Sequence, residues 1–309
     1  MNAQLLPSNK IDPAKWDHFI RSSPQGSVYH EYESLSALCV SWSAIIISDG
    51  DWMAVFPFER KQKYFVHYSF PPMFTQYLGP VISPDHENIT QELSEMIALR
   101  FKKMGRSLIA NFSPDYSHQA SWQNAGFKIA ERMTYWLDLD RSFANVQKGF
   151  SENIRRNIKK GQRRFEVRSN EMPIEIAIDL FRNEVGSALA ISSTQYNGYL
   201  KWITSLQTQK RATIYSSQLP DGSYAGFVII IESGKHRIYS MGALLASERN
   251  SGLSPLLLSS AITDAIDEGA SIFDFEGSMI EGIARFFKSF GSNKVRYNSV
   301  SLKKFPFRN

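Results

Sequence analysis

The sequence predicts an α/β (α+β) chain of two lobes, each a mixed, largely antiparallel sheet flanked by helices. The 309 residues, 43% of them hydrophobic, exceed the roughly 100–200 residues of one typical domain. Short β-branched and aromatic runs, bounded by glycine-containing turns, alternate with helical repeats in both halves. Each half also runs hairpin, strand, helix, strand, helix, strand. We therefore expect lobes at residues 1–141 and 142–309, related by a possible duplication.

The first lobe is expected to open with helical sequence and then form a hairpin. Residues 42–47 and 52–59 are rich in aromatic and β-branched side chains and flank the turn Ser48-Asp49-Gly50-Asp51. The helical spacing of Leu93, Met96, Ile97 and Phe101 predicts a helix over 85–103. The remaining elements expected are a strand at 107–112, a helix at 117–124 and a strand at 134–139.

The second lobe is expected to centre on three consecutive strands. They are joined by Pro220-Asp221-Gly222 and Ser233-Gly234-Lys235, where glycine supplies the positive φ of a tight turn. Before them come a basic helix, a short strand at 165–168 and helices at 174–185 and 199–208. The three strands are 212–217, 224–232 and 236–244; after them we expect a helix at 254–268, a strand at 272–275, a helix at 280–290 and a strand at 295–302.

Several function classes are disfavoured by what the sequence lacks. The lone cysteine, Cys39, has no disulfide partner, and the six histidines show no metal-ligand spacing, so no metal is expected. No G-x-S-x-G, P-loop or G-x-G-x-x-G motif occurs, which disfavours serine hydrolases, kinases and dinucleotide enzymes. No run approaches the ~18 apolar residues of a membrane span and no signal peptide is evident, so we expect a soluble cytoplasmic protein.

Basic residues are concentrated at the start of the second lobe. The net charge is +5, and seven cations between Arg155 and Arg168 are accompanied by one acid, Glu166. On a helix these positions cover more than one face. Either the helix is simply solvated, or it is a surface for an anionic partner such as tRNA.

The segment from Arg249 to Ser254 is a candidate anion site. A glycine-containing loop here leads directly into a helix, and a helix N-terminus presents unpaired N–H groups at the positive end of its dipole. Ser254 is expected as N-cap, with Pro255 at the first helical position. An ordinary helix start would show the same features, so the loop alone does not establish a ligand.

The order of elements around this loop resembles the GNAT acyltransferase superfamily. That family writes the loop as Q/R-x-x-G-x-G/A, and this chain matches at Arg249 and Gly252 but has Ser254 at the last position. The resemblance implies that acyl-CoA is the donor and that the loop binds its pyrophosphate. The cofactor-binding residues implied are Arg249, Asn250, Ser251, Gly252, Leu253 and Ser254.

A second resemblance is to the Fem-type group of two-lobed GNAT-like enzymes. It rests on Asp274-Phe275-Glu276-Gly277 and on Phe287-Lys288-Ser289-Phe290-Gly291, and it covers about residues 151–300. Members of that group transfer aminoacyl groups from tRNA to a cell-wall precursor. The helical-arm insertion of many tRNA-dependent members has no counterpart here. The group's pattern implies that Lys288, with Phe287 beside it, binds substrate phosphate.

Three residues are candidates for catalysis. Asp274 and Glu276 are two apart on a predicted strand and so are expected on one face at its C-terminal end, where a carboxylate could take a proton from an amine. Alternatively, Asp274 caps local backbone and Glu276 is solvated. Tyr239 shares a predicted strand face with Met241 and could protonate a leaving group, or it could be a core tyrosine.

Taken together, these features predict an N-acyltransferase that moves an acyl group from a thioester donor, acyl-CoA, to a small-molecule or peptide amine. Arg155, Tyr196 and Met241 are further candidates for substrate binding. Two alternatives stay open. One is a Fem-type tRNA-dependent aminoacyl transferase with a role in cell-wall biogenesis, and the other is a non-catalytic binding module that keeps the fold.

Overall fold

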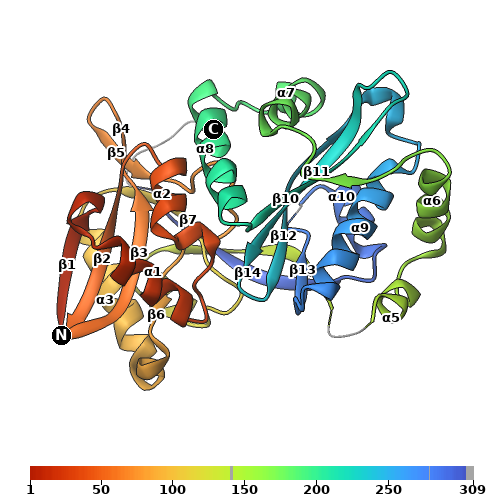
Figure 1. Ribbon diagram of the computed structural model, residues 1–309. Helices are drawn as coiled ribbons and strands as arrows, with labels where there is room; N and C mark the ends of the chain where they lie inside the picture. The colour runs from red at the N-terminus through yellow and green to blue at the C-terminus, as the bar shows by residue number, and fades with distance from the viewer. Residues whose placement is uncertain (140–141, 278, 304–309) are drawn as a thin grey trace. The chain divides into compact units, whose positions relative to one another are not determined.

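The computed structural model describes residues 1–139, 142–277 and 279–303, which form two compact units (Figure 1). Unit 1 contains Met1–Arg132 and the described residues from Arg296 onward, and unit 2 contains Met133–Val295. The division is therefore not a single cut after residue 141. Two long strands, β8 (Lys128–Asp138) and β14 (Asn293–Leu302), each cross the boundary, so the end of the chain returns to unit 1.

Unit 1 contains the four-stranded sheet β1-β2-β3-β6 and the strands β4-β5-β7-β14, which are one part of a ten-stranded sheet. The chain opens with a strand and not a helix, because β1 pairs with β2 from Asn2↔Ser48 to Pro7↔Ser43. The expected hairpin of β2 and β3 is present. The elements are β1 (Asn2–Pro7), η1 (Ser8–Lys10), α1 (Pro13–Ser22), η2 (Val28–His30), α2 (Tyr32–Leu38), β2 (Trp42–Asp49), β3 (Asp51–Glu59), β4 (Lys61–Lys63), β5 (Val66–Ser69), β6 (Val81–Ile82), η3 (Pro84–Ile89), α3 (Thr90–Lys103), β7 (Ser107–Asn111) and α4 (Gln119–Asn124).

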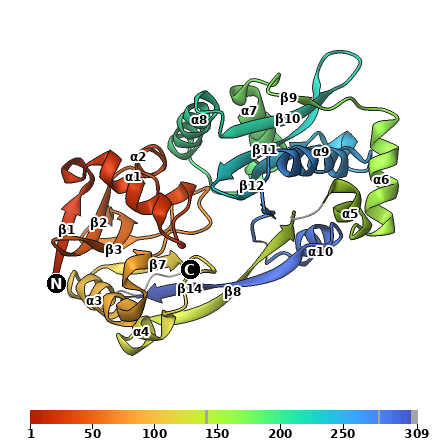
Figure 2. The same cartoon turned by 60° about the horizontal axis from the view of Figure 1, so that its bottom comes forward.

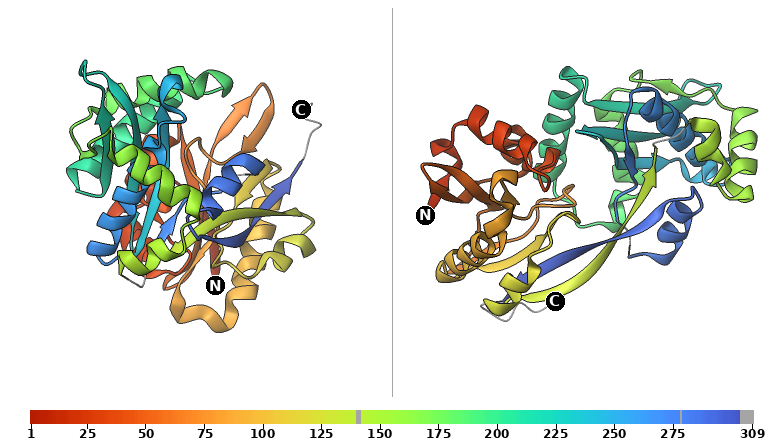
Figure 3. Two further views of the ribbon diagram at one scale, coloured as in Figure 1. Left: turned by 90° about the vertical axis from the view of Figure 1, so that its right-hand side faces the viewer. Right: turned by 90° about the horizontal axis from the view of Figure 1, so that it is seen from below.

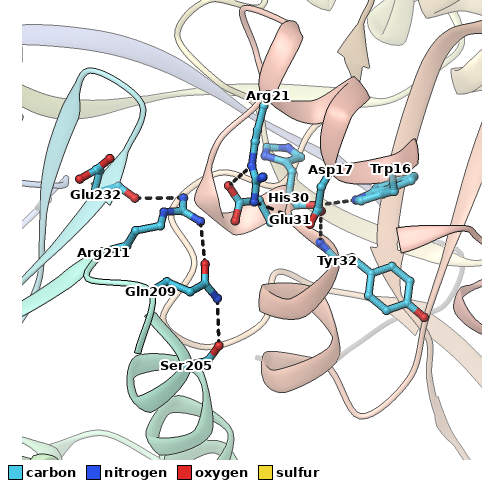
Figure 4. A network of polar contacts seen from close by, with 10 residues as sticks. All are labelled: Trp16, Asp17, Arg21, His30, Glu31, Tyr32, Ser205, Gln209, Arg211 and Glu232. Carbon is cyan, nitrogen blue, oxygen red and sulfur yellow. Dashed lines mark hydrogen bonds and ion pairs between the residues drawn. The ribbon is translucent and has the colours of Figure 1, made fainter. Parts of the chain in front are cut away.

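Helices cover both faces of the first sheet of unit 1. Along β2, Ile45 and Ile47 belong to the core shared with α3 and α4, whereas Ala44 and Ile46 belong to the core shared with α1. This alternation follows from the two-residue side-chain period of a strand. On the α1 side, the buried Trp16 indole donates to the carbonyl oxygen of His30 over 2.7 Å (Figure 4).

The strands of unit 2 are the remaining part of the ten-stranded sheet, in the order β8-β13-β12-β11-β10-β9, and they pair antiparallel throughout except between β12 and β13. Its elements besides β8 are α5 (Phe143–Lys148), α6 (Glu152–Gln162), β9 (Arg168–Ser169), α7 (Ile174–Glu184), η4 (Gly186–Ala188), α8 (Ser193–Thr208), β10 (Ala212–Gln218), β11 (Tyr224–Ser233), β12 (His236–Leu244), η5 (Ala246–Glu248), α9 (Leu253–Asp267), β13 (Ile272–Asp274) and α10 (Glu281–Lys288). The mixed α/β class and the largely antiparallel sheets flanked by helices are thus confirmed.

Both faces of the unit 2 sheet are buried. Helix α9 packs on β10, β11 and β12, and α6 packs on α9 (Figure 2). Val228 and Ile230 of β11 share a core with α9, while their neighbours Ile229 and Ile231 are buried as well. Helix α7 packs on β12 and α8 on β10. The end of α8 is fastened to β11 by Arg211, which donates to the carbonyl oxygen of Glu232 (Figure 4).

The start of α9 differs from the sequence prediction. The N-cap is Gly252, with a left-handed φ of +88°, and as a glycine it has no side chain that could cap the helix. Ser254 and Pro255 are therefore its second and third residues, so the prediction of Ser254 as N-cap was wrong. Within the described ranges, no helix has the length and hydrophobicity needed to cross a membrane.

Candidate active site

A cavity of about 870 Å³ lies in unit 2 where strands β12 and β13 stop pairing. The two strands pair only from His236↔Ile272 to Ile238↔Asp274, after which β13 ends and β12 continues to Leu244. The freed part of β12 forms one wall of the cavity. The other walls come from β11, α6, the end of α7, the loop before α9 and α10; the lining residues are Ser151, Asn153, Ile154, Asn157, Glu184, Val185, Phe227, Val228, Tyr239, Gly242, Ala243, Leu244, Arg249, Asn250, Gly252, Ser254, Pro255, Gly282, Ile283, Arg285, Phe286 and Ser289.

The cavity combines an apolar wall with cations. Phe227, Val228 and Leu244 line it from the sheet. Its charged residues are Arg249, Arg285 and Glu184. Arg249 is well exposed and lies 3.5 Å from a Glu184 carboxylate oxygen, and Arg285 pairs with the exposed Glu281 at 2.7 Å. Because the Arg285–Glu281 pair is exposed on both sides and such pairs contribute little, an anionic ligand can replace Glu281 at small cost, whereas Glu184 is more buried.

A β-bulge in β12 sets the direction of Tyr239. Ile229 is opposite Met241 and Ile230 is opposite Tyr239, so Ser240 is an extra residue on β12. The Ser240 hydroxyl lies 2.9 Å from that of Tyr199 on α8. The bulge interrupts the regular alternation: Tyr239 lines the cavity, whereas Met241 is buried and does not. The prediction that these two side chains share a regular strand face was therefore wrong.

The Tyr239 hydroxyl is held against the backbone at Gly242. A Cβ at Gly242 would collide with the Tyr239 hydroxyl and would lie 3.0 Å from the carbonyl oxygen of Phe227, so a glycine is needed there. The tyrosine ring is perpendicular to that of Phe287, with centroids 6.2 Å apart. Burial, and to a lesser extent the charge of Glu276, raises the pKa of Tyr239 to about 12. Its hydroxyl is thus protonated at neutral pH and can donate.

Asp274 is buried at the end of β13 and does not line the cavity. Its Oδ1 accepts hydrogen bonds from the Thr134 hydroxyl at 2.7 Å and from the backbone N–H of Glu276 at 2.8 Å. Burial raises the pKa of Asp274 to about 6, and these bonds act in the opposite direction. The nearby Trp136 indole also lowers the pKa of Asp274, although its N–H makes no hydrogen bond to a described residue. The hydrogen bonds of Asp274 thus hold the backbone at the end of β13 in place.

Glu276 does not share a strand face with Asp274, as the sequence had suggested. Strand β13 ends at Asp274, and Glu276 has a left-handed φ of +57°. Such a conformation is uncommon for a residue other than glycine. The half-buried carboxylate raises the pKa of both Tyr199 and Tyr239 through its charge. Like Asp274, Glu276 is not among the residues that line the cavity, but its charge acts on Tyr239, which is one of them.

The loop before α9 is a weaker anion site than its sequence implies. Leu253 donates its N–H to the Ser251 hydroxyl at 3.3 Å, and Pro255 has no N–H, so two of the first three helical residues offer no donor. A Cβ at Gly252 would meet the backbone of α6, including the Gly161 nitrogen at 2.9 Å. The glycine is thus required for packing against α6. Arg249, Asn250, Gly252 and Ser254 line the cavity, whereas Ser251 and Leu253 are buried behind it.

All five predicted substrate-binding residues lie outside the cavity lining: Met241, described above, and four others. Lys288 is exposed, and Phe287 is buried with its ring stacked 5.0 Å from that of Phe275. Tyr196 is buried beneath the Arg182 guanidinium, and Arg155 is exposed with a bond to the Lys148 carbonyl. The cavity is lined instead by Gly282, Ile283, Arg285 and Phe286 of α10 and by Ser289 directly after it; apart from Ile283 these positions recur at i, i+3, i+4 and i+7.

Other lining residues could not be recognised from local sequence. Glu184 and Asn157 carry no motif and reach the cavity only because α7 and α6 pack where they do. In the parts of the chain that the structure describes, no group of three His, Cys, Asp or Glu side chains could hold a metal ion.

Residues 148–288 match the acetyltransferase (GNAT) domain family. The GNAT resemblance is confirmed for this segment. It contains every cavity-lining residue except Ser289. No curated protein sequence matches the chain significantly.

Solved structures extend the GNAT likeness to both units. FemX superimposes with a TM-score of 0.71 at 13% identity, covering 96% of this chain and 97% of its own. L-PGS from Bacillus licheniformis gives 0.62 at 11% identity, covering 94% and 91%. A tandem GNAT protein from the clavulanic acid biosynthesis pathway gives 0.59 at 13% identity, covering 99% and 100%. At these identities the likeness shows the fold, which is that of the Fem-type, two-lobed GNAT group.

Proposed function

We propose that this protein is an N-acyltransferase whose donor, an acyl thioester of coenzyme A, binds in the unit 2 cavity. The carrying observation is the position of that cavity at the divergence of β12 and β13, with an apolar wall and the cations Arg249 and Arg285. An acyl-CoA has a matching division into an apolar acyl end and an anionic phosphate end. Because the helix start offers few N–H donors, the phosphates would depend on Arg249 and on the nearby Lys160, whose ammonium already contacts the Asn250 carbonyl at 2.7 Å.

The proposed reaction is a direct attack of the amine on the thioester. Beyond Ile238 the outer edge of β12 is no longer paired with β13, so its backbone N–H groups can stabilise charge that develops on the thioester oxygen. Glu276 takes a proton from the amine, the C–N bond forms and the C–S bond breaks. Tyr239 gives its proton to the departing thiolate and is then reprotonated by the proton that Glu276 took from the amine, so the product is a free thiol and both side chains are restored. In this scheme Asp274 holds the Glu276 backbone and does not touch substrate.

A second candidate is transfer of an aminoacyl group from tRNA. Its support is α6, whose exposed cations Arg155, Arg156, Lys159 and Lys160 lie on a helix that packs directly against the cavity loop. FemX also resembles the chain in fold. A tRNA whose phosphate backbone left the cavity near Lys160 would contact these side chains. Such binding would fall steeply with salt.

Calorimetric titration of the full chain with acetyl-CoA, octanoyl-CoA and an aminoacyl-tRNA, each at two salt concentrations, separates these candidates. We expect the thioesters to bind with weak salt dependence and to release free thiol when a panel of primary amines is added. Steeply salt-dependent binding of tRNA alone would favour the second candidate. If neither ligand binds, the chain is a non-catalytic module with a GNAT fold.

Arg249→Ala should weaken thioester binding about five- to tenfold, because a charge-assisted hydrogen bond at an exposed position contributes roughly 1 kcal/mol. Arg168→Ala is the matched control, since Arg168 is likewise exposed and ion-paired but lies outside the cavity. Equal affinities of the two variants would remove Arg249 from the donor site.

A further inference from the structure

A hairpin of unit 1 carries two exposed aromatic side chains at its tip. Strands β4 and β5 pair from Lys61↔Tyr68 to Lys63↔Val66, which leaves Tyr64 and Phe65 as a two-residue turn. Their exposed fractions are 82% and 79%; among the exposed large hydrophobic residues of the described chain, Tyr64 has the largest value and Phe65 shares the second with Val40. The hairpin, drawn in orange, projects from unit 1 (Figures 1 and 3).

This turn departs from the usual chemistry of two-residue hairpins. Tyr64 has a φ of +54°. Gly, Asn or Asp normally occupies a turn position of this kind because a bulky side chain is strained there. A tyrosine at this position, followed by a phenylalanine, therefore has a conformational cost as well as the cost of exposing two rings to water. Positions that break local rules in this way commonly serve a function.

The sequence around the tip is basic and contains no acid. Between Glu59 and Asp85 there are three cations, Arg60, Lys61 and Lys63, and no Asp or Glu. Lys61 is engaged with the buried Glu59 at 2.7 Å. Lys63 directly precedes Tyr64 and is exposed, and Arg60, at the base of the hairpin, is exposed as well, so both ends of β4 carry a positive charge and no acid in this segment offsets them.

The base of the hairpin is fastened to the body of unit 1. The buried Arg106 donates to the carbonyl oxygens of Lys61 and Tyr68, at 3.1 and 3.0 Å, and also contacts the Ser69 hydroxyl. Strand β5 also pairs in parallel with β7. The tip is thus presented on a rigid support, and ordering it on a partner costs little conformational entropy.

We propose that the β4–β5 tip docks on an anionic lipid surface, with Tyr64 and Phe65 entering the headgroup region. Aromatic side chains favour this interface because their rings are apolar and a tyrosine hydroxyl stays hydrated. Arg60 and Lys63 are attracted by anionic headgroups. Adjacent rings at a narrow tip suit insertion, whereas single-stranded nucleic acid needs a groove along which successive bases stack. The docking surface lies in unit 1, so it does not depend on acyl transfer in unit 2.

Co-sedimentation of the full chain with vesicles tests the proposal. One set contains phosphatidylcholine with about 30% phosphatidylglycerol and the other phosphatidylcholine alone, because the cations respond to surface charge. We expect reversible binding to the anionic vesicles that weakens with salt and is at least about tenfold weaker on the neutral ones.

The decisive variant is Tyr64→Gly with Phe65→Ser, since Gly-Ser is a favourable pair for a two-residue hairpin turn. This variant should fold at least as stably as the natural chain. It should bind anionic vesicles at least about tenfold more weakly, because the two rings no longer bury apolar surface in the headgroup region. Val40→Ser, at another apolar position that is 79% exposed, should change binding less than about twofold.

The proposal is overturned if the natural chain does not bind anionic vesicles, or if it binds both vesicle types equally. It is also overturned if the Gly-Ser variant melts at the same temperature as the natural chain and still binds like it. Binding of single-stranded polyuridylate that requires Tyr64 and Phe65, in the absence of vesicle binding, would assign the surface to nucleic acid instead.

Discussion

Asp274 and Glu276, two residues apart, experience opposite environments at the end of β13. Asp274 is buried and accepts two hydrogen bonds on one oxygen, including the backbone N–H of Glu276. That bond holds Glu276 at its left-handed φ, a conformation that needs support from its surroundings. The charge of Glu276 in turn acts on the hydroxyls of Tyr199 and Tyr239. We therefore assign Asp274 as a positioning residue and Glu276 as the proposed base.

The two roles predict different responses to substitution. Asp274→Asn keeps an Oδ1 that can accept both bonds, so it should retain most activity in the thiol-release assay, whereas Asp274→Ala and Glu276→Gln should each lose about 100-fold or more, the usual contribution of a positioned acid or base. The pH–rate profile supplies the control: Asp274→Asn should keep the acidic limb of the natural profile, because that limb reports the group that must be deprotonated to accept the amine proton. If Asp274→Asn is as inactive as Glu276→Gln, Asp274 is itself the proton acceptor.

The sequence predicted which elements form the site more accurately than it predicted which side chains line the cavity. The Phe287-Lys288 pair marks the right helix, but Phe287 packs inward on Phe275, and the neighbouring Arg285 and Phe286 line the cavity. Short motifs fix the spacing of residues and not the rotation of a helix against its sheet. The bulge that separates Tyr239 from Met241 has no local sequence signal either, because it depends on the register with β11.

Helices α6 and α9 meet through backbone at two glycines, and this contact forms one side of the cavity. A Cβ on Gly161 would lie 2.7 Å from the carbonyl oxygen of Gly252, and a Cβ on Gly252 would collide with that of Asn157. The left-handed φ of Gly252 adds a second constraint at that residue. Glycine in the loop motif is therefore explained by helix packing even before any ligand is considered.

Gly161→Ala should destabilise the chain by about 1–2 kcal/mol. Overpacking costs roughly 1–3 kcal/mol, and the better helix propensity of alanine offsets up to about 1 kcal/mol of this. Gly282→Ala is the matched control, since Gly282 also lies in a helix but has open space around its Cα; it should be neutral or stabilising by up to about 1 kcal/mol. Urea unfolding of both variants measures the difference, and changes of the same sign would contradict the packing argument.

The elements that the sequence predicted well carry their own local signals. The three strands β10, β11 and β12 are separated by glycine turns at Gly222 and Gly234, both with positive φ. The elements it missed depend on distant partners. Strand β1 has no alternating pattern and exists through its pairing with β2. Strand β9, which the sequence placed at 165–168, is only Arg168–Ser169 because β10 pairs with just those two residues.

Across the whole molecule, each unit buries one titratable group whose pKa is shifted within the same pH range. In unit 1, His30 is fully buried between the Ser27 hydroxyl and the Gly79 carbonyl, and burial lowers its pKa to about 4 from 6.5. In unit 2, burial raises the pKa of Asp274 to about 6 from 3.8. Both groups are thus held mainly in their neutral forms at mildly acidic pH.

The two shifts have opposite consequences for stability. Between pH 6.5 and about 4, the unfolded chain binds more protons at His30 than the folded chain does, so the stability of unit 1 falls on acidification. Between about 6 and 3.8, the folded chain binds more protons at Asp274, so the stability of unit 2 rises on acidification. One pKa unit corresponds to about 1.4 kcal/mol of unfolding free energy. From pH 7 to pH 5, unit 1 should therefore lose roughly 2 kcal/mol of stability through His30, and unit 2 should gain roughly 1 kcal/mol through Asp274.

Hydrogen exchange followed by mass spectrometry at pH 7 and pH 5, corrected for intrinsic rates, tests this prediction. Protection should fall in peptides around His30 and rise in peptides around Asp274. His30→Gln should flatten only the unit 1 response and Asp274→Asn only the unit 2 response, because each removes one titrating group and leaves the other in place. The prediction is contradicted if protection changes in the same direction in both units of the natural chain, or if the unit 1 response depends on Asp274. Either result would show that other groups control the acid sensitivity of the protein.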